Sequence, residues 1–118
     1  MAWEGKEKRR FVRASYPCKI VIFTPDEATF TVNTENIGAG GIRVILSREL
    51  RISLLTDLEV FLKDKAIKCK GRIVWVIKKD SQTPDNSPDY DTGIEFYRIS
   101  EEDRKFIKRV VESLASGQ

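Results

Sequence analysis

Histidine is absent from this chain of 118 residues. Histidine is the usual general base near neutral pH, and it completes the Ser-His and Cys-His nucleophile pairs as well as most zinc and iron sites. A chain without it lacks the groups on which the commonest hydrolases and metalloenzymes depend. We therefore predict a protein that is not an enzyme, with no catalytic residues, no metal site and no cofactor.

Cysteine is scarce as well, with only Cys18 and Cys69 in the whole chain. Two thiols do not make a disulfide framework, and their spacing matches no zinc-binding pattern. Both cysteines lie in segments that alternate like strands. Buried, reduced thiols that act as small hydrophobic side chains are the favoured interpretation, and a redox pair is the alternative.

Long hydrophobic runs are also missing. No apolar stretch approaches the roughly 20 residues that span a bilayer, and residues 1–6 have no apolar core of a signal peptide. The hydrophobic fraction of 41% and the charged fraction of 33% are ordinary for a globular domain, and the length suits a single one. We therefore predict one cytoplasmic domain that does not span a membrane.

Positive charge is in slight excess, and this excess is concentrated at one end of the chain. The formal net charge is +3, yet residues 1–19 hold six basic and two acidic residues, while the remainder holds 15 basic and 16 acidic residues. Residues 1–13 are polar and show no periodicity. We expect them to form a flexible basic arm; the charge alone is equally compatible with an arm that binds an anion and with a solvated terminus that only aids solubility.

Alternating apolar and polar residues predict six strands. Their expected ranges are 14–23, 29–35, 42–46, 58–62, 66–77 and 90–97. In the longest of these segments, Ile73, Trp75 and Ile77 are expected to face inward with Ile67 and Cys69. One face packed against the core and one face exposed to solvent are typical of an antiparallel sheet or barrel. The segment 47–57 fits a loop or a short helical turn equally well.

The C-terminal segment changes to helical spacing. Ser100 fits an N-cap followed by three acidic residues, and an apolar stripe follows it at Phe106, Ile107, Val110, Val111 and Leu114. We expect this stripe to pack on the barrel, with a partner-binding or dimerising helix as the alternative. The predicted fold is therefore mostly β: a six-stranded antiparallel β-barrel over residues 14–115, closed by an α-helix at about 100–114.

Acidic residues cluster in and beside the polar segment 79–89. Asp85, Asp89 and Asp91 could in principle form a pair of catalytic carboxylates. Acidic residues near proline-bearing loops are usually solvated, and the sequence shows no group that would desolvate them. We expect these three to be solvated surface residues.

Two segments have the chemistry of an anion-binding site. Arg9, Arg10 and Arg13 place three guanidinium groups within five residues. Their planar forks can bind phosphate oxygens, pair with the O6/N7 edge of guanine or stack on a base. The segment Asn36–Gly41 is expected to be a tight turn, with an amide that donates and accepts. Its glycines allow positive φ and a close approach of the backbone to a ligand.

These two segments, placed in this order ahead of a barrel, resemble the signature of the PilZ domain family. That signature is Arg-x-x-x-Arg on an N-terminal arm, followed by Asp/Asn-x-Ser-x-x-Gly after the second strand. The matching segments here are Arg9–Arg13 and Asn36–Gly41. The resemblance continues through the segments at 71–75 and 93–96, and covers about residues 6–115.

The resemblance implies a receptor for the bacterial second messenger cyclic di-GMP. Arg9 and Arg13 would bind phosphate and guanine, and Arg10 would add charge or stack. Asn36 and the backbone from Gly38 to Gly41 would hold a guanine or a phosphate on the barrel. Gly38 stands where the family has serine, so one hydroxyl contact is missing, which is typically worth about 1.5–3 kcal/mol.

The resemblance also predicts how such a receptor would signal. Binding of cyclic di-GMP would order the N-terminal arm against the barrel, and an unknown protein partner would recognise the altered surface. The alternative is a PilZ-like adaptor that binds no nucleotide and acts by protein–protein interaction. A small barrel that binds RNA or DNA ranks lowest, because no stacking platform of aromatic residues interleaved with basic ones is evident in the sequence.

Overall fold

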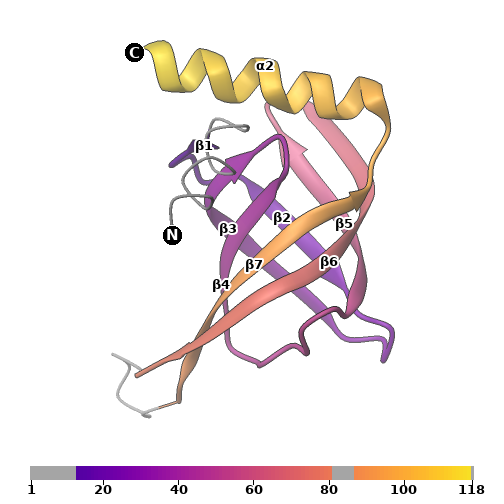
Figure 1. Cartoon of the computed structure of the whole chain (residues 1–118), viewed down its shortest axis with the longest axis vertical. Helices are drawn as coiled ribbons and strands as arrows, with labels where there is room; N and C mark the ends of the chain where they lie inside the picture. The colour runs from indigo at the N-terminus through magenta and orange to yellow at the C-terminus, as the bar shows by residue number, and fades with distance from the viewer. Residues whose placement is uncertain (1–12, 81–86, 118) are drawn as a thin grey trace, which may run out of the picture.

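A computed structural model of the chain describes residues 13–80 and 87–117. Within these ranges it contains seven strands and one helix (Figure 1). The strands are β1 (Arg13–Ala14), β2 (Lys19–Phe23), β3 (Thr29–Gly38), β4 (Gly41–Leu46), β5 (Leu55–Leu62), β6 (Lys65–Lys79) and β7 (Asp89–Arg98), and the helix is α2 (Glu101–Gly117). The undecided segment 47–57 contains the start of β5, at Leu55, after an irregular stretch.

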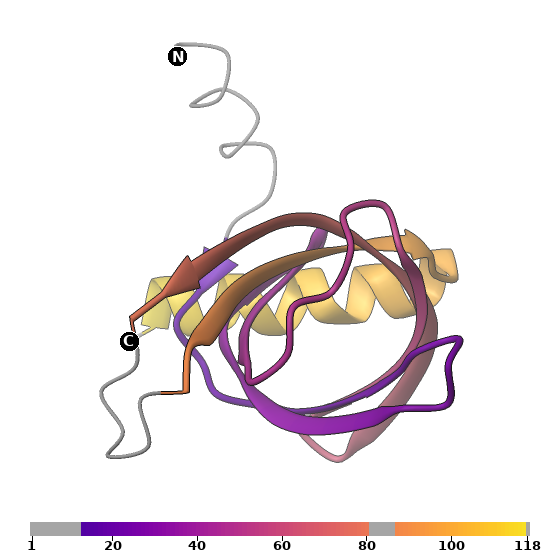
Figure 2. The same cartoon turned by 90° about the horizontal axis from the view of Figure 1, so that it is seen from below.

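The strands form one antiparallel sheet that closes on itself. Its order is β1-β3-β2-β5-β6-β7-β4, and an additional pairing of β3 with β4 joins the two ends of the six longer strands. Seen from below, the ribbon forms a ring with α2 behind it (Figure 2). The predicted six-stranded antiparallel barrel is therefore confirmed, with β1 as an extra short strand on β3.

The core fills the inside of this barrel with branched apolar side chains. Its fully buried members include Ile20, Ile22, Ile37, Ile42, Val44, Leu58, Val60, Ile67, Ile73 and Ile94. Each such side chain stabilises the fold by about 1.5–3 kcal/mol relative to an exposed position. Cys18 and Cys69 are free and buried, as predicted, and burial raises the pKa of Cys69 to about 12, which keeps its thiol protonated.

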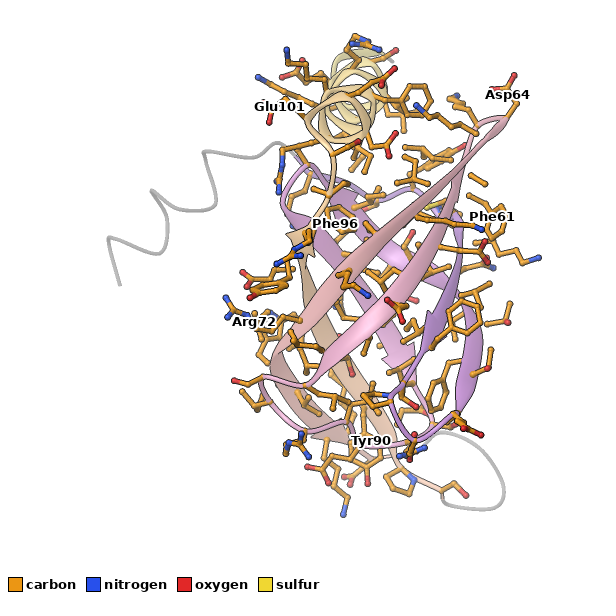
Figure 3. The ribbon with its side chains drawn as sticks, turned by 90° about the vertical axis from the view of Figure 1, so that its right-hand side faces the viewer. Phe61, Asp64, Arg72, Tyr90, Phe96 and Glu101 are labelled. Atoms are coloured by element: carbon orange, nitrogen blue, oxygen red, sulfur yellow. The ribbon has the colours of Figure 1, made fainter. Side chains whose placement is uncertain are left out.

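Helix α2 lies across one end of the barrel, with Glu101 at its start and Tyr90 near the opposite end of the molecule (Figure 3). The predicted N-cap is present, because the backbone N–H of Asp103 donates to Ser100 Oγ at 3.1 Å. Ile107 and Val111 are buried in the core, and the rest of the stripe packs against it. The apolar stripe of α2 therefore packs against the barrel, as predicted. No helix of the described chain is long and apolar enough to cross a membrane.

A β-bulge in β6 overturns one prediction about which side chains face inward. Ile73 pairs with Ile94 and Trp75 pairs with Gly93, so Val74 is an extra residue in the ladder. The extra residue shifts the alternation by one position. Trp75 and Ile77, which we expected inside, are therefore on the outer face and exposed.

The predicted turn at residues 36–41 is shorter than expected. Asn36, Ile37 and Gly38 belong to β3, and only Ala39 and Gly40 form the turn that leads to β4. None of the described glycines has a positive φ. Of the glycines in this segment, Gly41 is the one that a close approach requires, because an added Cβ would come within 2.3 Å of the backbone oxygen of Ile94 in β7.

Candidate ligand-binding site

A pocket of about 610 Å³ lies on the outer surface where the β3–β4 hairpin meets β6 and β7. Its volume is within the range of small-molecule sites. The residues that line it come from β1, β3, β4, β6 and β7, and from the turn before β4: Arg13, Asn36, Gly40, Gly41, Ile42, Arg43, Val74, Trp75, Gly93, Ile94 and Glu95. Segments far apart in the sequence are thus brought to one place by the closure of the barrel.

The two predicted motifs meet at one edge of this pocket. β1 pairs with the end of β3, with Arg13 opposite Gly38. The Arg13 side chain donates from Nε to Asn36 Oδ1 at 2.9 Å, and its Nη2 donates to the same oxygen. The neutral amide of Asn36 thus positions the guanidinium without neutralising its positive charge.

An aromatic side chain forms part of the wall. Trp75 is 37% exposed and lies against Gly93, where an added Cβ would come within 2.2 Å of the indole Nε1. Glycine at position 93 therefore makes room for the indole on the outer surface of β7. A partly exposed indole in a pocket that two arginines also line has the geometry to stack on a flat ring.

A second arginine reaches the pocket from β4. Arg43 donates to both carboxylate oxygens of Asp91, from Nε at 2.8 Å and from Nη2 at 2.9 Å, and Lys79 Nζ lies 3.3 Å from Asp91. Asp91 is only 4% exposed, so the prediction of a solvated carboxylate was wrong for this residue. The register of the sheet desolvates it, because it brings Arg43 of β4 and Lys79 of β6 against the carboxylate.

The charges of this cluster shift its pKa values in opposite directions. Hydrogen bonds from Arg43 lower the pKa of Asp91, with Lys79 contributing further. The hydrogen bond to Asp91 in turn raises the pKa of Arg43. Asp91 therefore acts as a fixed anion that orients Arg43 at the pocket.

We expect Asp91→Asn to lower the free energy of unfolding at pH 7 by about 1–3 kcal/mol, because Arg43 loses a charged bidentate partner. Since the folded pKa of Asp91 is lowered, this stabilisation is complete above its unfolded pKa of about 4 and is lost as the pH falls through the folded value. Urea denaturation from pH 7 to pH 3 should show the two proteins converging in acid. A constant difference across this range would contradict the assignment.

The predicted site residues fall into three groups. Arg13, Asn36 and Gly41 line the pocket, and Gly38 lies next to it as the strand partner of both Arg13 and Gly41. Arg9 and Arg10 lie outside the residues that the structure describes. The sequence reasoning missed Arg43, Trp75 and Gly93 as site residues, because their position at the pocket depends on the strand register and the bulge in β6.

Comparison with known proteins finds solved structures of the same fold and one protein family that matches the sequence. The family model described as PilZ domain matches residues 7–113. No curated protein matches the sequence.

Among solved structures, the PilZ domain of Escherichia coli YcgR with c-di-GMP is similar at 17% identity, with a TM-score of 0.72 and 92% of each chain covered. Bacillus subtilis MotI/DgrA, an inhibitor of motility, has a TM-score of 0.72 at 16% identity and 93% coverage of this chain. K. pneumonia MrkH has a TM-score of 0.74 at 14% identity and 89% coverage of this chain. The chain spans 53% of the length of MotI/DgrA and 47% of that of MrkH.

Proposed function

Since the chain belongs to the PilZ domain family, we propose that it is a receptor for cyclic di-GMP that binds this ligand in the pocket between β3, β4, β6 and β7. The observation that carries the proposal is the pairing of Arg13 with Asn36 at the edge of that pocket. It joins the two segments that the family signature describes. A role as a ligand-binding regulatory domain, and not as an enzyme, is what the family implies.

The chemistry of the pocket suits a flat, dianionic guanine nucleotide. Arg13 offers a guanidinium that can bind a phosphate or the O6/N7 edge of guanine. Trp75 offers a face for stacking a base. Arg43 adds a second positive group, held in place by Asp91. A cyclic dinucleotide needs these three kinds of contact at once, whereas a simple anion needs only the charges.

The N-terminal arm would complete the site. We assign Arg9 and Arg10 to the ligand as well, with Arg9 on phosphate or guanine and Arg10 adding charge or stacking. Arg13 is already fixed on β3 by strand pairing, so ligand-induced ordering would concern the residues before it. Fixing each of them costs about 1–2 kcal/mol of backbone entropy, which charge-assisted hydrogen bonds to the ligand would offset. A protein partner would then recognise the ordered arm.

Titration calorimetry tests the proposal directly. The full chain should bind cyclic di-GMP and should bind GMP, cyclic di-AMP and a single-stranded oligonucleotide far more weakly. Tryptophan fluorescence of a Trp3→Phe variant, in which Trp75 is the remaining indole, should change on titration because the base stacks on that ring. Absence of cyclic di-GMP binding would favour the adaptor, and preferential binding of the oligonucleotide would favour a nucleic-acid-binding barrel.

The adaptor remains the second candidate because of one residue. Gly38 stands where the family signature has serine, and it lies beside Arg13 in the ladder. A receptor without that hydroxyl loses one contact to its ligand. An adaptor would need neither the hydroxyl nor the positive charge of Arg13.

We expect Gly38→Ser to strengthen binding of cyclic di-GMP about tenfold, through one additional hydrogen bond to a charged group. Position 38 has no positive φ, so serine adds no backbone strain there. Alternation along β3 places residue 38 on the same face as Asn36. Gly38→Ala is the matched control, because it adds the Cβ without the hydroxyl. Equal affinities for the serine and alanine variants would refute this prediction.

A further inference from the structure

One row of residues crosses the pocket on the outer face of the sheet, from β1 to β6. Its members lie opposite one another in the successive strand pairs: Arg13, Gly38, Gly41, Glu95 and Arg72. The backbones of Arg13 and Glu95 are three strand spacings apart, or about 14 Å. The two positions between them are glycines, so a floor without side chains separates the guanidinium from the carboxylate.

Glu95 gives this pocket a negative group. Among the described residues that line it, Arg13 and Arg43 are basic and Glu95 alone is acidic. A carboxylate beside the phosphates of a dianionic ligand would repel them. Its place at the far end of the glycine floor from Arg13 suits a part of the ligand that donates hydrogen bonds.

Arg72 orients the Glu95 carboxylate through one of its two oxygens. Arg72 Nε donates to Glu95 Oε2 at 2.6 Å, and Arg72 Nη2 contacts the same oxygen. The guanidinium of Arg72 also lies over the ring of Tyr97, 5.1 Å from its centroid, on the outer surface of the barrel (Figure 3). Within the described chain, Oε1 of Glu95 receives no hydrogen bond. The side chain is 36% exposed, so this oxygen is available to a ligand.

The other side-chain acceptor at the pocket is already engaged. Asn36 Oδ1 accepts from both Nε and Nη2 of Arg13, which uses its two lone pairs. Glu95, in contrast, stands close to the proposed stacking face. Trp75 lies against Gly93, and Gly93 is two residues before Glu95 on the same face of β7. A base stacked on the indole would therefore present an edge to Glu95.

We propose that Glu95 selects guanine, by accepting hydrogen bonds from N1–H and the N2 amine of a base stacked on Trp75. Guanine carries these two donors side by side on its Watson–Crick edge. Adenine has an unprotonated N1 there, whose lone pair would face the carboxylate, so the same residue would reject cyclic di-AMP. This inference rests on the proposed function and adds to it the residue that reads the base.

Calorimetry of the full chain with three ligands tests the proposal: cyclic di-GMP, cyclic di-AMP, and cyclic di-IMP, whose bases lack only the N2 amine of guanine. The wild type should bind cyclic di-GMP about tenfold more tightly than cyclic di-IMP. In Glu95→Ala this ratio should fall to about one, because the acceptor of the N2 amine is gone. Removing the carboxylate also makes the pocket more positive, but that change acts on all three ligands and leaves their ratios unaffected.

Two further variants separate base reading from charge. Glu59→Ala is the matched control, since Glu59 pairs with Lys68 on the neighbouring strand at 3.8 Å and lies outside this pocket; it should keep the wild-type ratio. Glu95→Gln should bind cyclic di-AMP more tightly than the wild type does, because an amide can accept from N6 of adenine and donate to N1. Both Glu95 variants should unfold near the urea concentration of the wild type, because partly exposed ion pairs contribute little stability.

The outcomes distinguish this inference from the proposed function. A wild type that binds no cyclic dinucleotide would refute both. A wild type that binds cyclic di-GMP, and loses affinity in Arg13→Ala, but keeps its ratio to cyclic di-IMP in Glu95→Ala would refute only the role of Glu95. Glu95 would then serve its ion pair with Arg72 alone.

Discussion

Replacing Arg13 with alanine should weaken binding of cyclic di-GMP by at least about 1.5 kcal/mol, or roughly tenfold. The substitution removes a charge-assisted, potentially bidentate contact from the pocket. It also frees Asn36 Oδ1, which then has lost both donors from Arg13. Calorimetry of wild type and variant measures the loss.

Two further variants separate the causes of that loss. Arg13→Lys should be a poor substitute, because an ammonium keeps the charge and has no planar fork. Arg48→Ala is the control for removing any surface guanidinium, since Arg48 pairs with the exposed Asp26 away from the pocket. Equal affinity of the wild type and Arg13→Ala for cyclic di-GMP would show that Arg13 of β1 does not contact the ligand. Equal losses of affinity in Arg13→Ala and Arg48→Ala would show that only the net charge of the protein matters.

The barrel could be predicted from the sequence because its signals are local. Alternation at period two marked six strands, and the change to helical spacing after Ser100 marked α2. Both patterns depend only on which face of an element is buried. They can therefore be recognised without knowledge of the strand order. The apolar stripe of the helix was correctly assigned to the barrel, since Ile107 and Val111 are buried there.

The site was only half predictable because its remaining residues depend on strand register. Arg13 and Asn36 belong to short motifs that can be read along the chain. Trp75 reaches the outer face only because Val74 is a bulge residue, and no local pattern separates this arrangement from an uninterrupted strand. Asp91 is buried because the register of the sheet brings Arg43 of β4 and Lys79 of β6 against its carboxylate.

The turn before β4 connects the pocket to the helix. Gly40 lines the pocket, and its neighbour Ala39 accepts a hydrogen bond at 2.8 Å from Arg104 Nη1 of α2. A guanidinium from the helix thus holds the same hairpin that carries Asn36.

Gly41→Ala should lower the free energy of unfolding by about 3 kcal/mol or more. A Cβ at this position would lie 2.3 Å from the backbone oxygen of Ile94 and 2.9 Å from Cα of Glu95. Backbone atoms of a paired strand cannot rotate away, so β4 and β7 would have to separate where Gly41 pairs with Glu95. Urea denaturation measures the change.

Gly93→Ala distinguishes this backbone obstacle from a side-chain obstacle. The Cβ added at position 93 meets the indole of Trp75, which can turn out into solvent because it is already partly exposed. We expect a smaller loss of stability than for Gly41→Ala, a shift of Trp75 fluorescence in the Trp3→Phe background and weaker stacking of the ligand base. The prediction for Gly41→Ala would be contradicted if the variant kept wild-type stability and lost only affinity for the ligand. Gly41 would then act by contact with the ligand, as the family resemblance implied, and not by allowing β4 to approach β7.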